Sequence, residues 1–245
     1  MNTYPSESPS PTGDSLRAER KSHLGGLVVR KERWCLTLRG WLLGTGLILA
    51  CGFFVALTIH PFLAPTERLP AKLLVVEGWS PPSAMRTVIT EYRSGNYDQV
   101  ILVRPLFDVP DDYESGRSYG MWLVHLLVTN GVPESKLAVL FPKVTHKDRT
   151  YHSALVVKEW ISAHQPTVDA LNLATTGPHA RRSRLLYEKA FASKVKIGVI
   201  AMQSPGYDPH RWWQTSAGVR EIIGETIAYV YARIFFRAVD MTSNN

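Results

Sequence analysis

Cysteine is scarce in this chain: its 245 residues include two, Cys35 and Cys51. On one continuous helix these thiols would stand about 24 Å apart, because each helical residue rises about 1.5 Å, and that separation is too large for an intrachain disulfide. The rest of the chain has no cysteine. It therefore contains no thiol nucleophile and no thiolate metal ligand, and cysteine usage does not indicate its compartment.

Several motifs that would indicate a function directly are also missing. The chain has no HExxH pattern, so His146 and His152 are interpreted as surface or capping residues rather than metal ligands. No GxGxxG follows the first predicted strand, and no internal repeat is present. The net charge of +7 and the pI of about 9.5 would suit nucleic acid. The basic residues, however, form no known DNA-binding motif, so we expect no nucleic-acid partner and no metal site.

The longest uncharged stretch, residues 40–59, has the sequence GWLLGTGLILACGFFVALTI. About 20 apolar residues are enough to cross the hydrocarbon core of a bilayer. A soluble protein's helix of this length would normally carry a polar stripe. The stretch also starts too far into the chain for an ordinary cleaved signal peptide. The sequence therefore predicts a transmembrane helix over residues 36–62, with the lipid bilayer as a partner.

The charges that flank this helix predict its orientation. Arg68 and Lys72 follow it closely, whereas a larger group precedes it: Arg20, Lys21, Arg30, Lys31, Arg33 and Arg39. The positive-inside rule places the more basic side in the cytoplasm. We therefore expect an inner (plasma) membrane protein with a cytoplasmic N-terminus and a periplasmic, extracytoplasmic C-terminal domain. Residues 1–35 are predicted to be a disordered arm, and residues 63–70 a linker.

From residue 71 onwards, apolar runs typical of buried strands alternate with helical patterns. Residues 73–76 form the first run, and Met85, Val88, Ile89 and Tyr92 follow it at helical spacing. Further strands are predicted at residues 99–103, 137–141, 170–175 and 195–201. This alternation predicts an α/β fold: a three-layer Rossmann-like domain with a mainly parallel five-stranded sheet over residues 71–238.

The strand at residues 170–175 leads into Gly177, Pro178 and a helix that begins near His179. A helix N-terminus favours anions, because free backbone N–H groups and the helix dipole point the same way. In parallel sheets the ligand crevice lies beyond the carboxyl ends of the strands. That rule gathers the predicted ligand-binding residues from several loops: Gly78, Arg104, Arg149, Thr150, Thr176, Gly177 and Arg182. Asp148 or Thr150 is expected to cap the helix that starts there.

Five motifs follow one another in this domain. They are the strand at residues 73–76 with Gly78, the helix closed by Gly131-Val132-Pro133, Thr150 opening the next helix, the element Thr176-x-x-His179-x-x-Arg182, and a C-terminal glutamate, Glu221 or Glu225. In this order they resemble the YdcF/SanA/ElyC-like family of bacterial envelope proteins, over about residues 71–235. The resemblance implies a Rossmann-like fold, a membrane anchor in many members, and roles in envelope or peptidoglycan-related assembly, but no accepted reaction.

The chain departs from the family pattern at three places. Its first turn is Glu77-Gly78-Trp79 instead of Leu-Gly-Gly, and its second strand ends in Arg104-Pro105 instead of Ser-Gly-Gly. The family's Thr-x-Glu-Asn is Thr150-Tyr151-His152-Ser153, without the acid and the amide. Either the ligand differs from that of better-known relatives, or Glu77 replaces the missing carboxylate.

These residues predict an anion site in which arginines hold a phosphate or pyrophosphate through paired N–H donors. Glu77 and His179 are the predicted catalytic acid–base residues. An outward-facing pocket would suit a phosphorylated or anionic glycan or lipid precursor of the cell envelope, with hydrolysis or transfer as the reaction. Three alternatives stay open: Glu77 pairs with Arg86 or Arg104, the protein is a non-enzymatic assembly or regulatory factor, or the scaffold binds a nucleotide-like cofactor such as S-adenosylmethionine.

The C-terminal helix is predicted from an apolar stripe: Val219, Ile222, Ile223, Thr226, Ile227, Val230, Tyr231 and Ile234. Trp212-Trp213, just before it, is interpreted as a packing anchor. The stretch from Tyr229 to Phe236 is too short to span a membrane and carries Arg233, although its residue types also suit contact with lipid.

Overall fold

A computed structural model describes residues 22–23, 28–29, 35–104, 110–142, 145 and 147–238, with the backbone alone at residues 22–23, 28–29, 82 and 110–119. The chain forms two compact units, residues 1–49 and residues 50–245. In the first unit, β1 (Ser22–His23) pairs antiparallel with β2 (Val28–Val29). The arm predicted to be disordered is residues 1–35. Apart from β1, β2 and Cys35, it lies outside the described residues.

The predicted transmembrane segment is helical. Helix α1 (Leu38–Leu63) is long and apolar enough to cross a membrane, and none of its most apolar stretch is buried against protein. Large side chains such as Leu42 and Phe54 are about two-thirds exposed. An apolar surface of this length is stable in hydrocarbon and costly in water, which supports the predicted membrane anchor.

The second unit contains a five-stranded sheet, as predicted. Its strands are β3 (Leu73–Glu77), β4 (Gln99–Val103), β5 (Leu137–Leu140), β6 (Ala170–Thr176) and β7 (Lys196–Met202). They lie in the order β5-β4-β3-β6-β7, and every pair is parallel. The central strand β3 is buried along its whole length, which explains its unbroken apolar run.

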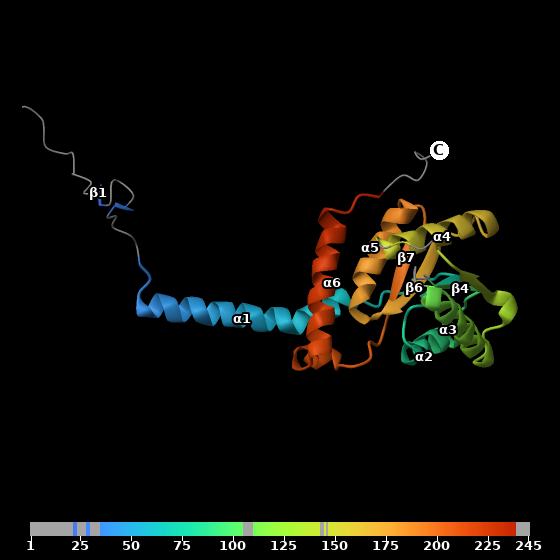
Figure 1. Ribbon diagram of the computed structural model, residues 1–245, viewed down its shortest axis with the longest axis horizontal. Helices are drawn as coiled ribbons and strands as arrows, with labels where there is room; N and C mark the ends of the chain where they lie inside the picture. Colours follow the sequence, from blue (N-terminus) through green and yellow to red (C-terminus); the bar gives the residue numbers. More distant parts are fainter. Residues whose placement is uncertain are drawn as a thin grey trace, which may run out of the picture. The chain divides into compact units, whose positions relative to one another are not determined.

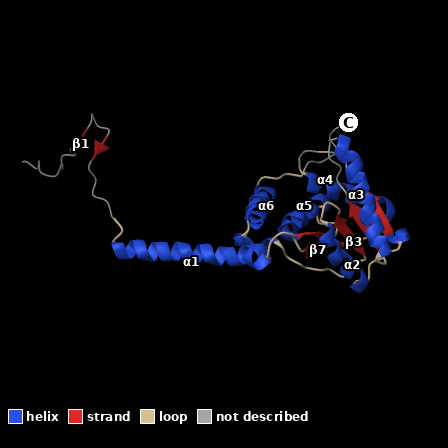
Figure 2. Ribbon diagram, turned by 60° about the horizontal axis from the view of Figure 1, so that its bottom comes forward, coloured by secondary structure: helices blue, strands red, loops and turns tan. Residues whose placement is uncertain are grey.

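Helices cover both faces of this sheet, so the domain has three layers (Figures 1 and 2). Helices α2 (Met85–Ser94) and α3 (Pro110–Thr129) pack on one face, and α4 (Arg149–His164) and α5 (Ala180–Phe191) pack on the other. The last helix, α6 (Ser216–Ile234), packs against α5. Four short 3-10 turns complete the domain: Pro82–Ala84, Glu134–Lys136, Gly177–His179 and Pro209–Gln214.

The core is divided by the sheet, because successive side chains of a strand point to opposite faces. Leu74 and Val76 pack with α2 and α3, whereas Leu73 and Val75 pack with α4 and α5. Burying one aliphatic side chain stabilises a fold by about 1.5–3 kcal/mol. These two clusters therefore hold the strand ends, and the loops that follow them, in fixed positions.

The predicted linker, residues 63–70, is docked on the domain instead of hanging free. The backbone N–H of Glu67 donates to the Val199 carbonyl at 2.8 Å, and the Val199 N–H donates back at 2.9 Å, at the outer edge of β7. The Leu69 N–H donates to Oδ1 of the buried Asn172 at 2.9 Å. The backbone of this segment therefore satisfies groups that the edge strand would otherwise leave unpaired.

One local expectation from the sequence was wrong. Asp148 occupies the N-cap position of α4 with a left-handed backbone (φ 51°), but its side chain makes no capping hydrogen bond there. Thr150 lies inside the helix and faces His179.

The predicted apolar stripe of the C-terminal helix lies partly on the surface of α6. Ile222 is buried, but Ile223, Ile227 and Ile234 are each at least half exposed.

Candidate functional site

The candidate site lies where the winding of the sheet reverses. From β3 the chain proceeds outward to β4 and β5, then returns to β6 on the other side of β3. The helix after β3 and the helix after β6 cover opposite faces, so a crevice opens beyond the carboxyl ends of these two strands. The position predicted from the sequence is therefore the one where the structure has its cavity.

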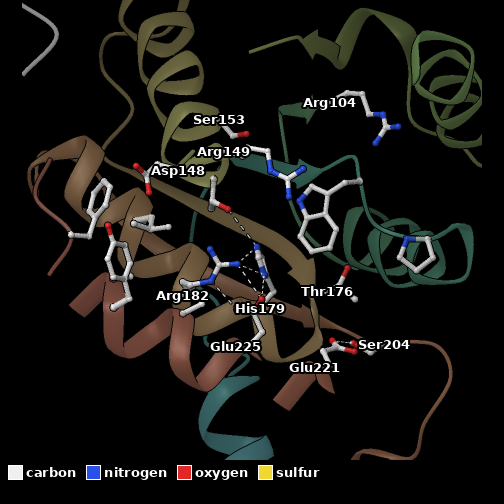
Figure 3. Close-up of a pocket in the computed structure, with 18 of the residues that line it drawn as sticks. Arg104, Asp148, Arg149, Ser153, Thr176, His179, Arg182, Ser204, Glu221 and Glu225 are labelled. Atoms are coloured by element: carbon white, nitrogen blue, oxygen red, sulfur yellow. Dashed lines mark hydrogen bonds and ion pairs between the residues drawn. The ribbon is translucent and has the colours of Figure 1, made fainter. Parts of the chain in front are cut away.

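The cavity has a volume of about 880 Å³ (Figure 3). The polar residues that line it are Arg104, Asp148, Arg149, Thr150, Ser153, Thr176, His179, Arg182, Ser204, Glu221 and Glu225. The apolar residues that line it are Trp79, Pro81, Leu186, Pro205, Ala228, Tyr231, Ala232 and Phe236. Of the nine predicted site residues, Arg104, Arg149, Thr150, Thr176, His179 and Arg182 line it, whereas Glu77, Gly78 and Gly177 lie behind its wall.

His179 is fixed by a carboxylate from α6. Its Nδ1 lies 2.8 Å from Oε1 of Glu225. Because an ionised carboxylate accepts hydrogen bonds and donates none, we place the proton of the neutral imidazole on Nδ1. The other ring nitrogen, Nε2, then carries a lone pair, and it lies 3.5 Å from the Thr150 hydroxyl. This is the orientation that a general base requires.

Arg182 is bound to the same carboxylate. Its Nε donates to Oε2 of Glu225 at 2.8 Å and its Nη2 donates to Oε1 at 3.1 Å. Nη2 also lies 2.7 Å from Nδ1 of His179. The sequence predicted Arg182 as an anion ligand, and in the structure its guanidinium already has an internal anion as partner.

Glu225 is ionised across the physiological range. Burial alone would raise its pKa, but hydrogen bonds from His179 and Arg182, together with their charges, lower the pKa to about 2. Glu221, one helical turn earlier, behaves in the opposite way. Burial raises its pKa, the hydrogen bond from Ser204 lowers it, and the nearby charge of Glu225 raises it, with a net upward shift. Two carboxyl groups on one helix face therefore hold their protons over different pH ranges.

Glu77, a predicted catalytic residue, is buried next to His179. Its side chain is 1% exposed, and Oε2 accepts hydrogen bonds from the hydroxyls of Thr175 and Ser183, the latter at 3.1 Å. Oε2 lies 3.9 Å from Nε2 of His179, and Glu77 is not among the residues that line the cavity.

The arginines on the opposite side of the cavity come from two different strand ends. Arg104 follows β4 and donates from Nη1 to the Gly78 carbonyl at 3.4 Å. Arg149 opens α4 and, like Arg104, lines the cavity. Trp79 lines it as well and meets the ring of His179 edge-on, with centroids 4.6 Å apart.

The two predicted glycines lie in turns where a side chain would not fit. Gly177 has a positive φ of 35°, and a Cβ there would lie 2.3 Å from the Ser204 hydroxyl oxygen. A Cβ on Gly78 would lie 3.0 Å from Leu102 and 3.1 Å from the Val103 carbonyl. Thr176, between these turns, donates from its hydroxyl to that of Ser80 at 2.8 Å.

The part of the site that the sequence did not predict is the wall formed by α6 and the loop before it. Glu221 and Glu225 were two candidates for one role, and the structure gives each a separate partner, Ser204 and His179. One signal was available: two carboxylates at i and i+4 within an otherwise apolar helix lie on one face. No group of three or more His, Cys, Asp and Glu residues is arranged to hold a metal among the described residues, and His146 lies outside them.

Comparison with known proteins found no matching family model and no matching curated protein. The resemblance to the YdcF/SanA/ElyC-like family therefore rests on the order of the motifs in the sequence.

Proposed function

We propose that this chain is a membrane-anchored, YdcF-like protein of cell-envelope biogenesis. Its cavity would bind a phosphorylated or anionic glycan or lipid precursor and act on it by hydrolysis or group transfer. The observation that carries the proposal is the histidine oriented by Glu225 in a cavity whose opposite wall carries Arg104 and Arg149.

Anion binding is supported by Arg104 and Arg149, which both line the cavity. Arg149 stands at the first turn of α4, where backbone N–H groups and the helix dipole also favour negative charge. A guanidinium binds phosphate through two parallel N–H donors, which gives direction as well as charge. Asp148 lies on the same wall and would disfavour a second negative group beside it. The proposed ligand therefore places its phosphate toward Arg149 and Arg104.

Acid–base chemistry is supported by the groups on the other wall. With Nδ1 bound to Glu225, Nε2 of His179 can take a proton from water or from an acceptor hydroxyl that attacks the phosphate or glycan. Glu221, whose pKa is raised, can deliver a proton to the leaving oxygen. After the products leave, proton exchange with water restores both groups.

The shape of the cavity supports a ligand with a non-polar part. A volume of about 880 Å³ is large enough for a small organic ligand. Leu186, Tyr231 and Phe236 supply an apolar surface opposite the arginines. A phosphate attached to a prenyl or acyl chain would satisfy both surfaces.

One contact favours the non-enzymatic alternative. Nη2 of Arg182 approaches both ring nitrogens of His179, at 2.7 and 3.2 Å, and partly covers the ring. A ring held in this way would sense or position a ligand without exchanging protons. In that case the protein would be an assembly or regulatory factor with the same binding pocket.

The test uses the full chain in lipid nanodiscs with a polyprenyl phosphate as the probe. Replacing Arg149 with Ala should weaken binding about tenfold or more, because a charge-assisted contact contributes about 1.5–3 kcal/mol. Arg86→Ala is the matched control, since Arg86 is exposed on α2 and outside the cavity. Equal affinity of both variants and the natural protein would contradict the proposed site.

His179→Gln separates the two proposed functions. If the protein is an enzyme, this variant keeps binding the probe and loses turnover. If it is an assembly factor, neither the natural protein nor any variant shows turnover.

A further inference from the structure

Helix α6 presents an apolar face to the outside of the domain. Its exposed side chains include Ile223, Ile227, Val230, Tyr231, Ile234 and Phe235, each between 43% and 67% exposed. They recur at intervals of three and four residues and so form one continuous stripe. The buried face of the same helix, with Ile222 and Ala232, packs on the domain. The helix is thus apolar on both sides.

A surface helix of a soluble protein places polar residues on its outer face, because exposed apolar area lowers stability in water. Single exposed apolar residues are common, but a stripe that follows a helix along its length marks a contact with a partner or a membrane. The outer face of α6 therefore has the character of a contact surface.

The neighbour of α6 indicates what this surface contacts. The end of α1 contacts both α6 and the turn before it: the rings of Phe62 and Tyr229 are 5.6 Å apart, and the indole N–H of Trp212 donates to the Ala56 carbonyl at 2.9 Å. Arg181 of α5 lies 4.1 Å above the Phe62 ring. In both ribbon views, α6 lies at the edge of the domain beside residues 50–63 of α1 (Figures 1 and 2). Helix α6 is therefore held directly against the end of the membrane helix, with its exposed stripe on another face than Tyr229.

We propose that α6 lies in the interface of the same bilayer that α1 crosses, with the stripe from Ile223 to Phe235 among the headgroups and upper acyl chains. Interfacial helices have an apolar face toward the lipid and basic and aromatic residues around it. Here Arg220, Arg233 and Arg237 are exposed near the ends of the stripe, and Trp213 is 39% exposed in the turn before the helix. The domain would then be held to the membrane at two places, α1 and α6.

This arrangement also determines from where the cavity is loaded. Tyr231 belongs to the exposed stripe and also lines the cavity, beside Ala228 and Ala232. If α6 rests on the bilayer, the apolar wall of the cavity adjoins the lipid surface. A ligand whose anionic headgroup projects from the membrane could then enter without leaving it. This last step depends on the proposed function, whereas the membrane contact of α6 does not.

The membrane contact is measured by fluorescence quenching in the full chain, in nanodiscs, with Cys35→Ser and Cys51→Ser as the background. A fluorophore is attached at Ile227→Cys, and at Met121→Cys as the control, because Met121 is 60% exposed on α3 and is also apolar. We expect brominated lipids to quench the label at position 227 severalfold more than at position 121. Aqueous iodide should quench the label at position 227 severalfold less than the label at position 121.

Two results would overturn the proposal. Equal quenching at the two positions would place α6 in water. Protection of position 227 from both iodide and brominated lipid would show that protein, such as a second copy of the chain, covers the stripe. A label at Ile234→Cys repeats the measurement at a second position in the stripe, in case one substitution disturbs the helix. The readout requires neither ligand nor turnover, so its failure is distinct from failure of the proposed function.

Discussion

Nδ1 of His179 and Oε1 of Glu225 lie 2.8 Å apart although 46 residues separate them in the chain. The contact joins the start of α5, at the end of the central sheet, to the outer helix α6. It orients the imidazole and neutralises Arg182 at once, because the second carboxylate oxygen binds that guanidinium. Removing one group therefore changes both the orientation of the histidine and the charge of the site.

Glu225→Gln should lower the free energy of unfolding at pH 7 by about 2–3 kcal/mol. The folded state lowers the pKa of Glu225 from 4.5 to about 2, so its contribution is complete above pH 4.5 and is lost as the pH falls toward 2. Chemical unfolding in detergent, followed by circular dichroism from pH 7 to 3, should show a steeper loss for the natural protein than for the variant. Glu188→Gln is the control, because Glu188 forms a partly exposed pair with Arg184 that contributes about 0–1 kcal/mol. Parallel pH curves for the natural protein and Glu225→Gln would contradict this account.

Ser204→Ala should shift the alkaline limb of the pH–activity profile to higher pH. The Ser204 hydroxyl donates to Glu221 at 2.7 Å and lowers its pKa, so removing the hydroxyl raises that pKa further. An acid that must be protonated is lost as the pH rises through its pKa, and the raised pKa extends activity upward. Glu221→Gln should reduce turnover about 100-fold or more while the probe still binds. An unchanged profile in Ser204→Ala would remove Glu221 from the reaction.

Gly177→Ala should destabilise the protein by about 1–3 kcal/mol, because the new methyl group would overlap the Ser204 hydroxyl and the backbone has a positive φ. Gly206→Ala is a matched control: its φ is 95°, but no atom lies within 4 Å of an added Cβ, so it carries the backbone strain without the overlap. Ser204→Ala in the Gly177→Ala background should restore part of the loss in thermal unfolding. No recovery would show that backbone strain accounts for the whole effect.

Asn172→Ala should release residues 66–69 from the sheet and cost about 2–4 kcal/mol, because three hydrogen bonds end at this buried amide. Oδ1 accepts from the Leu69 N–H, and Nδ2 donates to the Leu69 carbonyl and to the Tyr97 hydroxyl, each at 2.9 Å. Limited proteolysis of the reconstituted chain should then cut within residues 64–70. The exposed Asn96→Ala serves as control and should leave the cleavage pattern unchanged. Resistance of both variants would mean that the segment is held elsewhere.

Much of the fold was predictable because its signals are local. The unbroken apolar run at residues 73–76 indicated a central parallel strand, and β3 is buried throughout. The helical spacing of Met85, Val88, Ile89 and Tyr92 predicted α2, which spans Met85–Ser94. The rule that ligands bind beyond the carboxyl ends of parallel strands brought six of the nine predicted site residues to one cavity. The linker's backbone partner, Val199, could not be predicted, because no sequence pattern records which edge strand a segment will meet.

The sequence by itself determined the membrane helix, the alternation of strands and helices, and the end of the sheet at which polar side chains gather. These features depend on the spacing of apolar residues and on the direction of parallel strands. Only the tertiary structure decided that Arg182 binds Glu225, that Glu77 lies behind His179, and that the stripe of α6 faces outward. Each of these three features depends on which surfaces of distant helices meet. The periodicity of a sequence indicates that one face of a helix is apolar, but it does not indicate what covers that face.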